Sequence, residues 1–216
     1  MDVELTYCVV NTDQRQLLNY CLDAIARERA TVEFETETIV LDNASWDGSA
    51  DAARQHAVTT DVIALSERAG RAEAATALLQ RARGRFCLLL NEDSELEPGA
   101  TVALHAALAG ADRAGAAGAT LVDPDGEQQP SAWRFPSAGT ALLSMVGLKN
   151  RLVVQSHGPQ IREVDWAPPA ALLVRRDAAE AVGWFGDDEI DFCRRLHGAG
   201  WRVLYVPEAR AVHHEQ

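Results

Sequence analysis

RFCLLLNEDSE (residues 85–95) joins a short apolar run to three carboxylates, those of Glu92, Asp93 and Glu95. A short apolar run of this kind indicates a strand that is buried on both faces. Acidic residues directly after such a strand have two interpretations. They form either a solvated loop tip or a strand end that presents oxygen ligands to a metal ion.

Outward from this stretch, short apolar runs alternate with segments of helical pattern. The apolar runs predict strands at residues 5–10, 38–42, 62–65 and 86–90. Three segments predict helices: the apolar repeat at residues 17–25, the segment from Asp47 that begins with good capping residues, and the alanine-rich residues 71–82. Strand–helix alternation predicts an α/β fold of three layers, α/β/α, with a mainly parallel central sheet.

The second half of the chain has a less regular pattern. We expect helices at residues 98–109, 138–148 and 188–197, strands at 115–122 and 171–176, and a turn at 123–130. Nothing in the pattern marks a domain boundary, so residues 1–216 are predicted to form a single domain.

Composition excludes several classes of protein. The formal net charge is −12, which opposes binding to nucleic acid. No apolar run approaches the length of a membrane span, and the N-terminus has no positively charged leader. The four scattered cysteines are expected to be buried free thiols. A cytoplasmic protein without a transmembrane segment is the resulting expectation.

Polar residues follow three of the predicted strands: Asn11-Thr12-Asp13, Asp42-Asn43 and Asn91-Glu92-Asp93. In a parallel sheet these three groups meet at one edge, where ligands of open α/β sheets bind. Neither the GxGxxG fingerprint nor the P-loop pattern is present. A phosphate group at this edge is therefore expected to bind through a metal ion, for which Asp93 is a candidate ligand and the His213-His214 pair a candidate nitrogen source.

Six segments in order resemble the family-2 glycosyltransferases of the GT-A (Rossmann-like) fold, especially the rhamnosyltransferase-like enzymes of bacterial cell-surface polysaccharide synthesis. They are residues 9–25, 39–51, 84–100, 121–136, 164–183 and 188–215. The resemblance implies a metal-dependent inverting transfer of a sugar from a nucleoside diphosphate sugar to a hydroxyl of a saccharide or lipid-linked acceptor. It also implies a nucleotide-binding half, residues 1–95, and an acceptor-side half, residues 96–216.

The resemblance assigns roles to individual residues. The nucleotide is held by the polar strand ends, Asn11, Thr12, Asp13, Asp42 and Asn43, and by Gly70 before the third helix. Both asparagines of the family's motif around Gly70 are missing, so Arg68 or Arg71 is expected to bind the diphosphate instead. A divalent metal, Mg²⁺ or Mn²⁺, is bound at Asp93, with Asn91 and His213 close by, and not at Glu92, Ser94 or Glu95. Inversion requires a carboxylate that takes the proton of the acceptor hydroxyl.

The motif that carries this base departs from the family. Asp188-Glu189 stands where the family has Glu-Asp, so Glu189 is the expected base and Asp188 the alternative, while Asp191 is expected to brace the helix. Arg194 and Arg195 are interpreted as a solvated helix face that pairs with nearby acids. Since this motif is altered and the loop before it is short, a catalytically silent nucleotide-sugar binding or scaffolding protein is the alternative function.

The acceptor side carries a further expectation. The sequence ends soon after the two histidines, where family members commonly continue with acceptor-binding helices. We therefore expect this side to be open or apolar and to be completed by a homodimer or a partner enzyme, with Trp133, Phe135 and Trp184 near the contact. Trp166 is interpreted as the tryptophan that contacts sugar.

Overall fold

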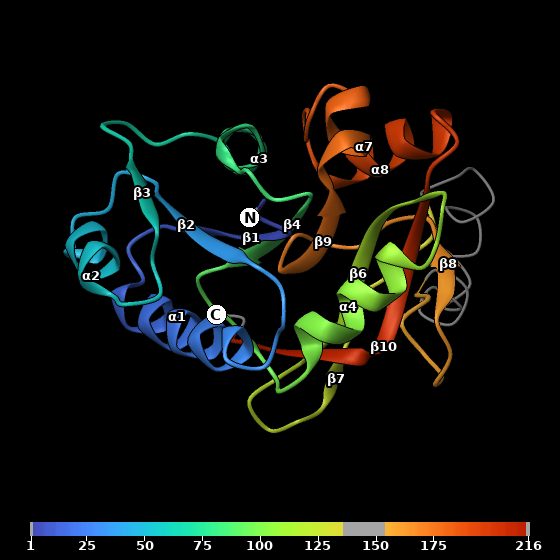
Figure 1. Ribbon diagram of the computed structural model, residues 1–216, viewed down its shortest axis with the longest axis horizontal. Helices are drawn as coiled ribbons and strands as arrows, with labels where there is room; N and C mark the ends of the chain where they lie inside the picture. The colour runs from blue at the N-terminus through green and yellow to red at the C-terminus, as the bar shows by residue number, and fades with distance from the viewer. Residues whose placement is uncertain (1, 136–153, 215–216) are drawn as a thin grey trace, which may run out of the picture.

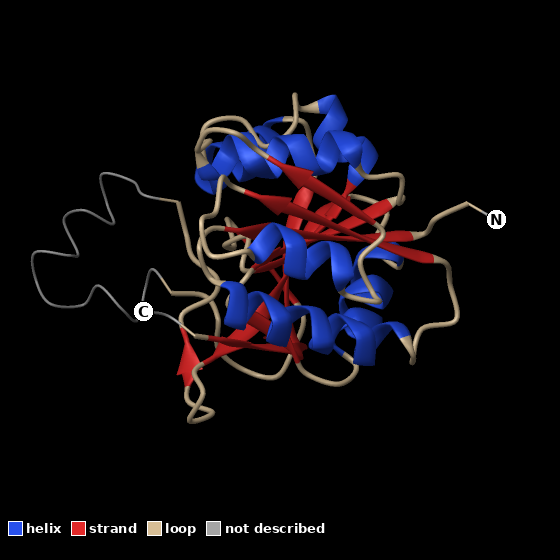
Figure 2. Cartoon of the chain, turned by 90° about the vertical axis from the view of Figure 1, so that its left-hand side faces the viewer, coloured by secondary structure: helices blue, strands red, loops and turns tan. Residues whose placement is uncertain are grey.

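The computed structural model describes residues 2–135 and 154–214, which form one ten-stranded sheet with helices on both faces (Figures 1 and 2). The strands are β1 (Leu5–Asn11), β2 (Thr36–Asp42), β3 (Asp61–Ala64), β4 (Phe86–Asn91), β5 (Ser94–Leu96), β6 (Ala114–Val122), β7 (Gln128–Gln129), β8 (Arg162–Val164), β9 (Ala171–Arg175) and β10 (Arg202–His213). The helices are α1 (Arg15–Arg29), α2 (Ser49–Gln55), α3 (Arg71–Arg81), α4 (Ala100–Ala109), α7 (Arg176–Ala181) and α8 (Glu189–Gly198).

Each central strand contributes side chains to two separate cores. In β1, for example, Tyr7 and Val9 pack into one core while Cys8 packs into the other. Buried residues of α1, α2 and α4 belong to the first core, and those of α3, α7 and α8 belong to the second. The predicted three-layer α/β/α architecture is therefore confirmed, and it explains why the strands are apolar runs rather than alternating patterns.

The sheet begins as a parallel sheet and then becomes mixed. Its order is β3-β2-β1-β4-β9-β6-β10-β5, with β7 beside β6 and β8 beside β10. The first four strands in this order pair in parallel, as do β6 and β10. Strand β9 is antiparallel to both of its neighbours, β4 and β6. One sheet therefore continues from the first half of the chain into the second.

Four strands, β5, β7, β8 and β10, were absent from the sequence-based expectation. Strand β10 contains Pro207, Glu208 and Arg210, which interrupt its apolar pattern, and its pairing with β6 shifts register between Val206 and Arg210. Proline and a bulge are typical of irregular strand positions. Strand β5 is only three residues long and pairs with the end of β10.

Three further expectations concern the cysteines, one helix and a membrane span. All four cysteines are free and buried, as predicted. The helix expected at 138–148 lies outside the described residues. Among residues 2–135 and 154–214, no helix combines the length and the hydropathy that crossing a bilayer requires.

Candidate active site

Two adjoining cavities lie at the carboxyl ends of the parallel strands. The strand-end cavity, of about 480 Å³, is lined by Thr12, Asn43 and Asn91, which follow or end β1, β2 and β4. The α8 cavity, of about 800 Å³, lies between the loop after β4, the start of α8 and the end of β10. Arg71 and Asp93 line both cavities. The two cavities therefore form one continuous binding region.

The predicted convergence of the polar strand ends is observed. Asn11 pairs with Asp42 in the β1–β2 ladder, and Val10 pairs with Asn91 in the β1–β4 ladder. Asn11 and Asp42 are nevertheless almost fully buried. Asn11 Nδ2 donates to Asp42 Oδ1 at 3.0 Å, and Ser45 N donates to Asp42 Oδ2 at 3.1 Å. The Asp42 carboxylate therefore holds the loop after β2 in place.

Asn43 shapes one wall of the strand-end cavity. Asn43 Oδ1 accepts from Ala69 N at 2.8 Å, and Asn43 Nδ2 donates to Ala69 O at 3.1 Å. These two bonds fix the loop that leads into α3, whose N-cap is Gly70. A Cβ atom at Gly70 would meet nothing within 4 Å, so the protein itself leaves space beside this backbone.

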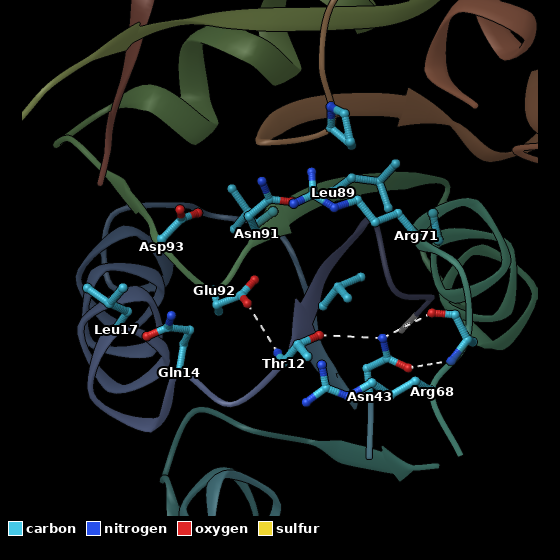
Figure 3. A pocket seen from close by; sticks show the side chains of 15 residues that line it. Thr12, Gln14, Leu17, Asn43, Arg68, Arg71, Leu89, Asn91, Glu92 and Asp93 are labelled. Carbon is cyan, nitrogen blue, oxygen red and sulfur yellow. Dashed lines mark hydrogen bonds between the residues drawn. The ribbon is translucent and has the colours of Figure 1, made fainter. Parts of the chain in front are cut away.

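Basic and acidic groups face each other across the strand-end cavity. Figure 3 shows Glu92 and Asp93 on one side and Asn43, Arg68 and Arg71 on the other. Arg68 forms an ion pair with Asp13, which ties the loop before α3 to the end of β1. Arg71, at the first position of α3, is exposed toward both cavities.

Glu92 is directed toward β1. Its Oε1 accepts from Thr12 N at 3.1 Å, as the dashed line in Figure 3 shows. Burial raises the pKa of the Glu92 carboxyl, and the bond from Thr12 opposes that rise. Glu92, the second residue of the predicted metal motif, thus lines the strand-end cavity. It does not line the α8 cavity.

The fit to a metal ion rests on Asp93 and His213. Asp93 Oδ1 is buried and has no hydrogen-bond partner within the described residues, and it lies 3.5 Å from His213 Nε2. The opposite ring nitrogen, His213 Nδ1, is 3.1 Å from Gln129 Oε1, which orients the imidazole. A carboxylate oxygen without a partner beside an oriented imidazole suits a divalent cation.

The protein alone provides an incomplete ligand set. In the part of the chain that the structure describes, no group of three or more His, Cys, Asp or Glu side chains gathers around one point. A cation here would need further oxygen ligands, which a substrate diphosphate can supply. Glu95 is paired with His214 at 2.8 Å instead, and Asn91 lines both cavities beside Asp93.

Strand pairing explains why these residues meet. The antiparallel β5–β10 ladder places His213 opposite Ser94, the residue after Asp93. His214 N also donates to Asp93 O at 3.0 Å. Two residues 120 positions apart in the numbering are therefore brought together by a strand of three residues.

The start of α8 presents carboxylates to the α8 cavity. Asp188 is the N-cap, and its Oδ1 accepts from Asp191 N at 2.7 Å. Glu189 is half-buried and lines the cavity together with Asp187 and Asp188. Since capping occupies the Asp188 side chain, the geometry favours Glu189 as the carboxylate with freedom to bind another group.

Arg195 has a different environment from the solvated one that was expected. Its Nε donates to Asp191 Oδ2 at 2.8 Å, so Asp191 braces the helix as predicted. The guanidinium also donates to the carbonyls of Val182, Trp184 and Phe185. The expected pairing with a nearby acid is therefore confirmed for Arg195, and Arg194 is exposed. Arg195 is nevertheless half-buried, because its guanidinium also bonds these three carbonyls of the turn before α8.

The aromatic residues expected near a partner contact pack against other residues of the chain. Trp133 lines the α8 cavity, Phe135 lies against His197, and Arg176 lies over the ring of Trp184. Their place in a homodimer or a complex with a partner enzyme stays a prediction. Gln129 and Trp133 were not among the predicted site residues, because neither type belongs to a catalytic pattern in sequence.

Comparisons with known proteins agree with this geometry. The family model "Glycosyl transferase family 2" matches residues 7–166. The N-acetylglucosaminyl-diphospho-decaprenol L-rhamnosyltransferase of Mycobacterium tuberculosis is 30% identical over 226 residues, covering 88% of this chain and 72% of that protein.

Solved structures share the fold at lower identity. A mannosyltransferase from Pyrobaculum calidifontis in complex with GDP-Man and Mn²⁺ matches with a TM-score of 0.67 at 19% identity, over 99% of this chain and 57% of that protein. TarS of S. aureus in complex with UDP-GlcNAc matches with a TM-score of 0.69 at 15% identity, over 99% of this chain and 60% of that protein. The chain therefore spans less than two thirds of these two solved proteins. The family match and the identity to the curated relative show that the chain belongs to glycosyl transferase family 2, with the GT-A fold.

Proposed function

We propose that this chain transfers a sugar from a nucleoside diphosphate sugar to a hydroxyl of an acceptor, with inversion at the transferred carbon. The observation that carries the proposal is the pair formed by Asp93 and His213, which lines the α8 cavity together with Glu189. A cation site and a general base in one cavity are the two groups that such a transfer needs.

The nucleotide is proposed to occupy the strand-end cavity. Thr12 and Asn43 there offer hydrogen-bonding groups for a base or a ribose, and Arg71 offers a guanidinium for the diphosphate. Asn11, Asp42 and Asp13 support this wall from behind through the bonds described above. Gly70, which has no side chain, leaves space beside its backbone for the diphosphate.

Asp93 and His213 are proposed to hold a Mg²⁺ or Mn²⁺ ion together with the diphosphate. When bound, such an ion neutralises the negative charge that develops on the departing diphosphate. Asp93 contributes a charged oxygen, and Gln129 keeps the His213 ring in its binding orientation. Asn91 remains beside this pair as a neutral amide.

Glu189 is proposed to take the proton of the acceptor hydroxyl. It lies in the first turn of α8, where the partial positive charge of the helix N-terminus favours an ionised carboxylate. The Asp188 cap and the Asp191–Arg195 pair keep this turn in one conformation. The proton passes to the Glu189 carboxylate while the acceptor oxygen forms its bond to the sugar and the diphosphate leaves from the opposite face.

The curated relative suggests the substrates. Its name states transfer of L-rhamnose to an N-acetylglucosaminyl diphosphate on a polyprenol. We infer a nucleoside diphosphate rhamnose as the donor and a lipid-linked saccharide as the acceptor for this chain, in the synthesis of a cell-surface glycan.

A binding and turnover panel tests the proposal. Nucleoside diphosphate rhamnoses with thymidine, uridine and guanosine, each with and without Mn²⁺, are added in a thermal-shift assay and then in a product assay with lipid-linked N-acetylglucosaminyl diphosphate. We expect one donor to raise the melting temperature in a metal-dependent way, because it binds the folded state, and to be consumed. A donor that binds but is neither transferred nor hydrolysed would support the silent alternative.

A further inference from the structure

Trp133 is a preformed aromatic wall of the α8 cavity. The residue is half-buried and lines this cavity together with Asp93, Glu189 and His213. Its ring stacks on that of Trp166, with centroids 4.4 Å apart and planes inclined by 16°. One face of the Trp133 ring is therefore covered by another ring of the same chain.

The stack is held by backbone bonds in both directions. Trp133 N donates to Trp166 O at 3.0 Å, and Trp166 N donates to Trp133 O at 3.1 Å. The indole nitrogen of Trp166 donates to Arg134 O at 3.3 Å, so the polar group of this ring is already bonded. The sequence favoured Trp166 as the sugar contact, whereas in the structure Trp133 lines the cavity and Trp166 supports it.

The rest of the cavity indicates what binds against this ring. Asp187 and Glu189 supply carboxylate oxygens that line the same cavity. A flat apolar surface next to hydrogen-bond acceptors matches a pyranose, whose ring C–H groups form an apolar face and whose hydroxyls project around its edge. The ring position is fixed in advance by Trp166, which lowers the conformational entropy lost when a ligand binds.

We propose that a pyranose ring stacks on Trp133 in the α8 cavity, with Trp166 as the support behind it. This inference rests on the proposed function, because the cavity is the one in which transfer occurs. The pyranose belongs either to the donor sugar or to the acceptor saccharide, and both present the same chemistry to the indole.

Trp133→Phe and Trp133→Leu form the test pair. Both replacements keep a bulky apolar side chain, and only phenylalanine keeps a flat ring. Trp46→Leu is the matched control, because this tryptophan is 90% exposed and lines neither cavity. Calorimetry in Mn²⁺ measures the affinity of each variant for the free nucleoside diphosphate and for its rhamnose conjugate, and kinetics measure the acceptor KM.

We expect Trp133→Leu to weaken sugar binding by about tenfold, from the typical strength of aromatic stacking, and Trp133→Phe to remain within about threefold of wild type. All variants should bind the free nucleoside diphosphate equally. A loss confined to the conjugate assigns the pyranose to the donor, and a rise confined to the acceptor KM assigns it to the acceptor.

Equal donor affinity and equal acceptor KM in Trp133→Leu and Trp133→Phe would overturn the inference. That result differs from a failure of the proposed function, in which wild type itself binds no nucleoside diphosphate sugar.

Discussion

The strand-end cavity and the α8 cavity adjoin, but their polar groups are in different states. Around the strand-end cavity, side chains bond to one another or to nearby backbone, as Asp42 does with Asn11 and Asn43 with Ala69. Asp93, which lines both cavities, has a buried Oδ1 without a hydrogen-bond partner among the described residues, and Glu189 lines only the α8 cavity. Under the proposed function, the bonded groups position the nucleotide, and Asp93 and Glu189 take part in the transfer.

This difference predicts which property each substitution changes. Replacing a bonded group of the strand-end cavity should alter nucleotide affinity together with stability, because the same bonds hold the loops. Replacing Glu189 should alter turnover while leaving nucleotide affinity in place, whereas replacing Asp93 should remove the metal-dependent part of that affinity.

Glu189→Gln should have the largest effect. The amide keeps the shape of the side chain and removes the base, so we expect turnover to fall by about 100- to 10,000-fold with nearly unchanged nucleotide affinity. Steady-state kinetics and calorimetry measure the two quantities. The control is Asp188→Asn, which retains a capping side chain. Full activity in Glu189→Gln with none in Asp188→Asn would show that the base is Asp188.

Arg195→Ala should come next. Loss of the guanidinium frees the turn before α8, and a displacement of about 1 Å at the reacting groups can cost about 100-fold in rate. Donor KM should stay close to the wild-type value, because Arg195 lies outside the strand-end cavity. Arg195→Lys is the control that keeps the charge but cannot bond three carbonyls. A rate equal to wild type in Arg195→Ala would contradict the positioning role.

Asp42→Ala tests the strand-end cavity. The Asp42 carboxylate is buried and does not line the cavity, so its loss should act through the loop after β2 and lower nucleotide affinity by about tenfold. Since Asn11 and Ser45 also lose their shared acceptor, the melting temperature should fall as well. Calorimetry and thermal unfolding on the same sample measure both. A folded variant with unchanged affinity would remove Asp42 from the recognition of the nucleotide.

Glu37, near the opposite end of β2, should affect neither cavity. Burial raises the pKa of its carboxyl, but bonds from Arg83 N, Thr6 Oγ1 and the Arg83 guanidinium outweigh burial and lower it overall. A lowered folded-state pKa stabilises the fold above the ordinary carboxyl pKa, and this stabilisation is lost as pH falls through the folded-state value.

Glu37→Gln should therefore be less stable than wild type at neutral pH, with the difference shrinking in acid, while kcat and donor KM stay constant. Urea unfolding across this acidic range measures the free energy of unfolding. A stability difference that does not change with pH would contradict the assignment to ionisation.

Sequence reasoning predicted the first half of the fold well because its strands are continuous apolar runs with polar ends. The meeting of Asn11, Asp42 and Asn91 follows from parallel pairing alone. Strand β10 could not be predicted in the same way, because Pro207 and charged residues break its pattern and only pairing with β6 defines it.

The site shows the same limit at the level of side chains. Asp93 and His213 were expected close together from the family resemblance, but the reason for their contact is the pairing of β5 with β10. The capping bond of Asp188 and the position of Trp133 depend on tertiary geometry that local spacing does not encode.

Calorimetry with Mn²⁺ and a nucleoside diphosphate tests the central claim most directly. We predict coupled binding in which Mn²⁺ raises nucleotide affinity by at least about tenfold. Asp93→Ala should abolish the coupling, and Glu95→Ala, two positions away and paired with His214, should retain it. Tight nucleotide binding that is equal in Mn²⁺ and in chelator, in wild type and in Asp93→Ala alike, would contradict the account.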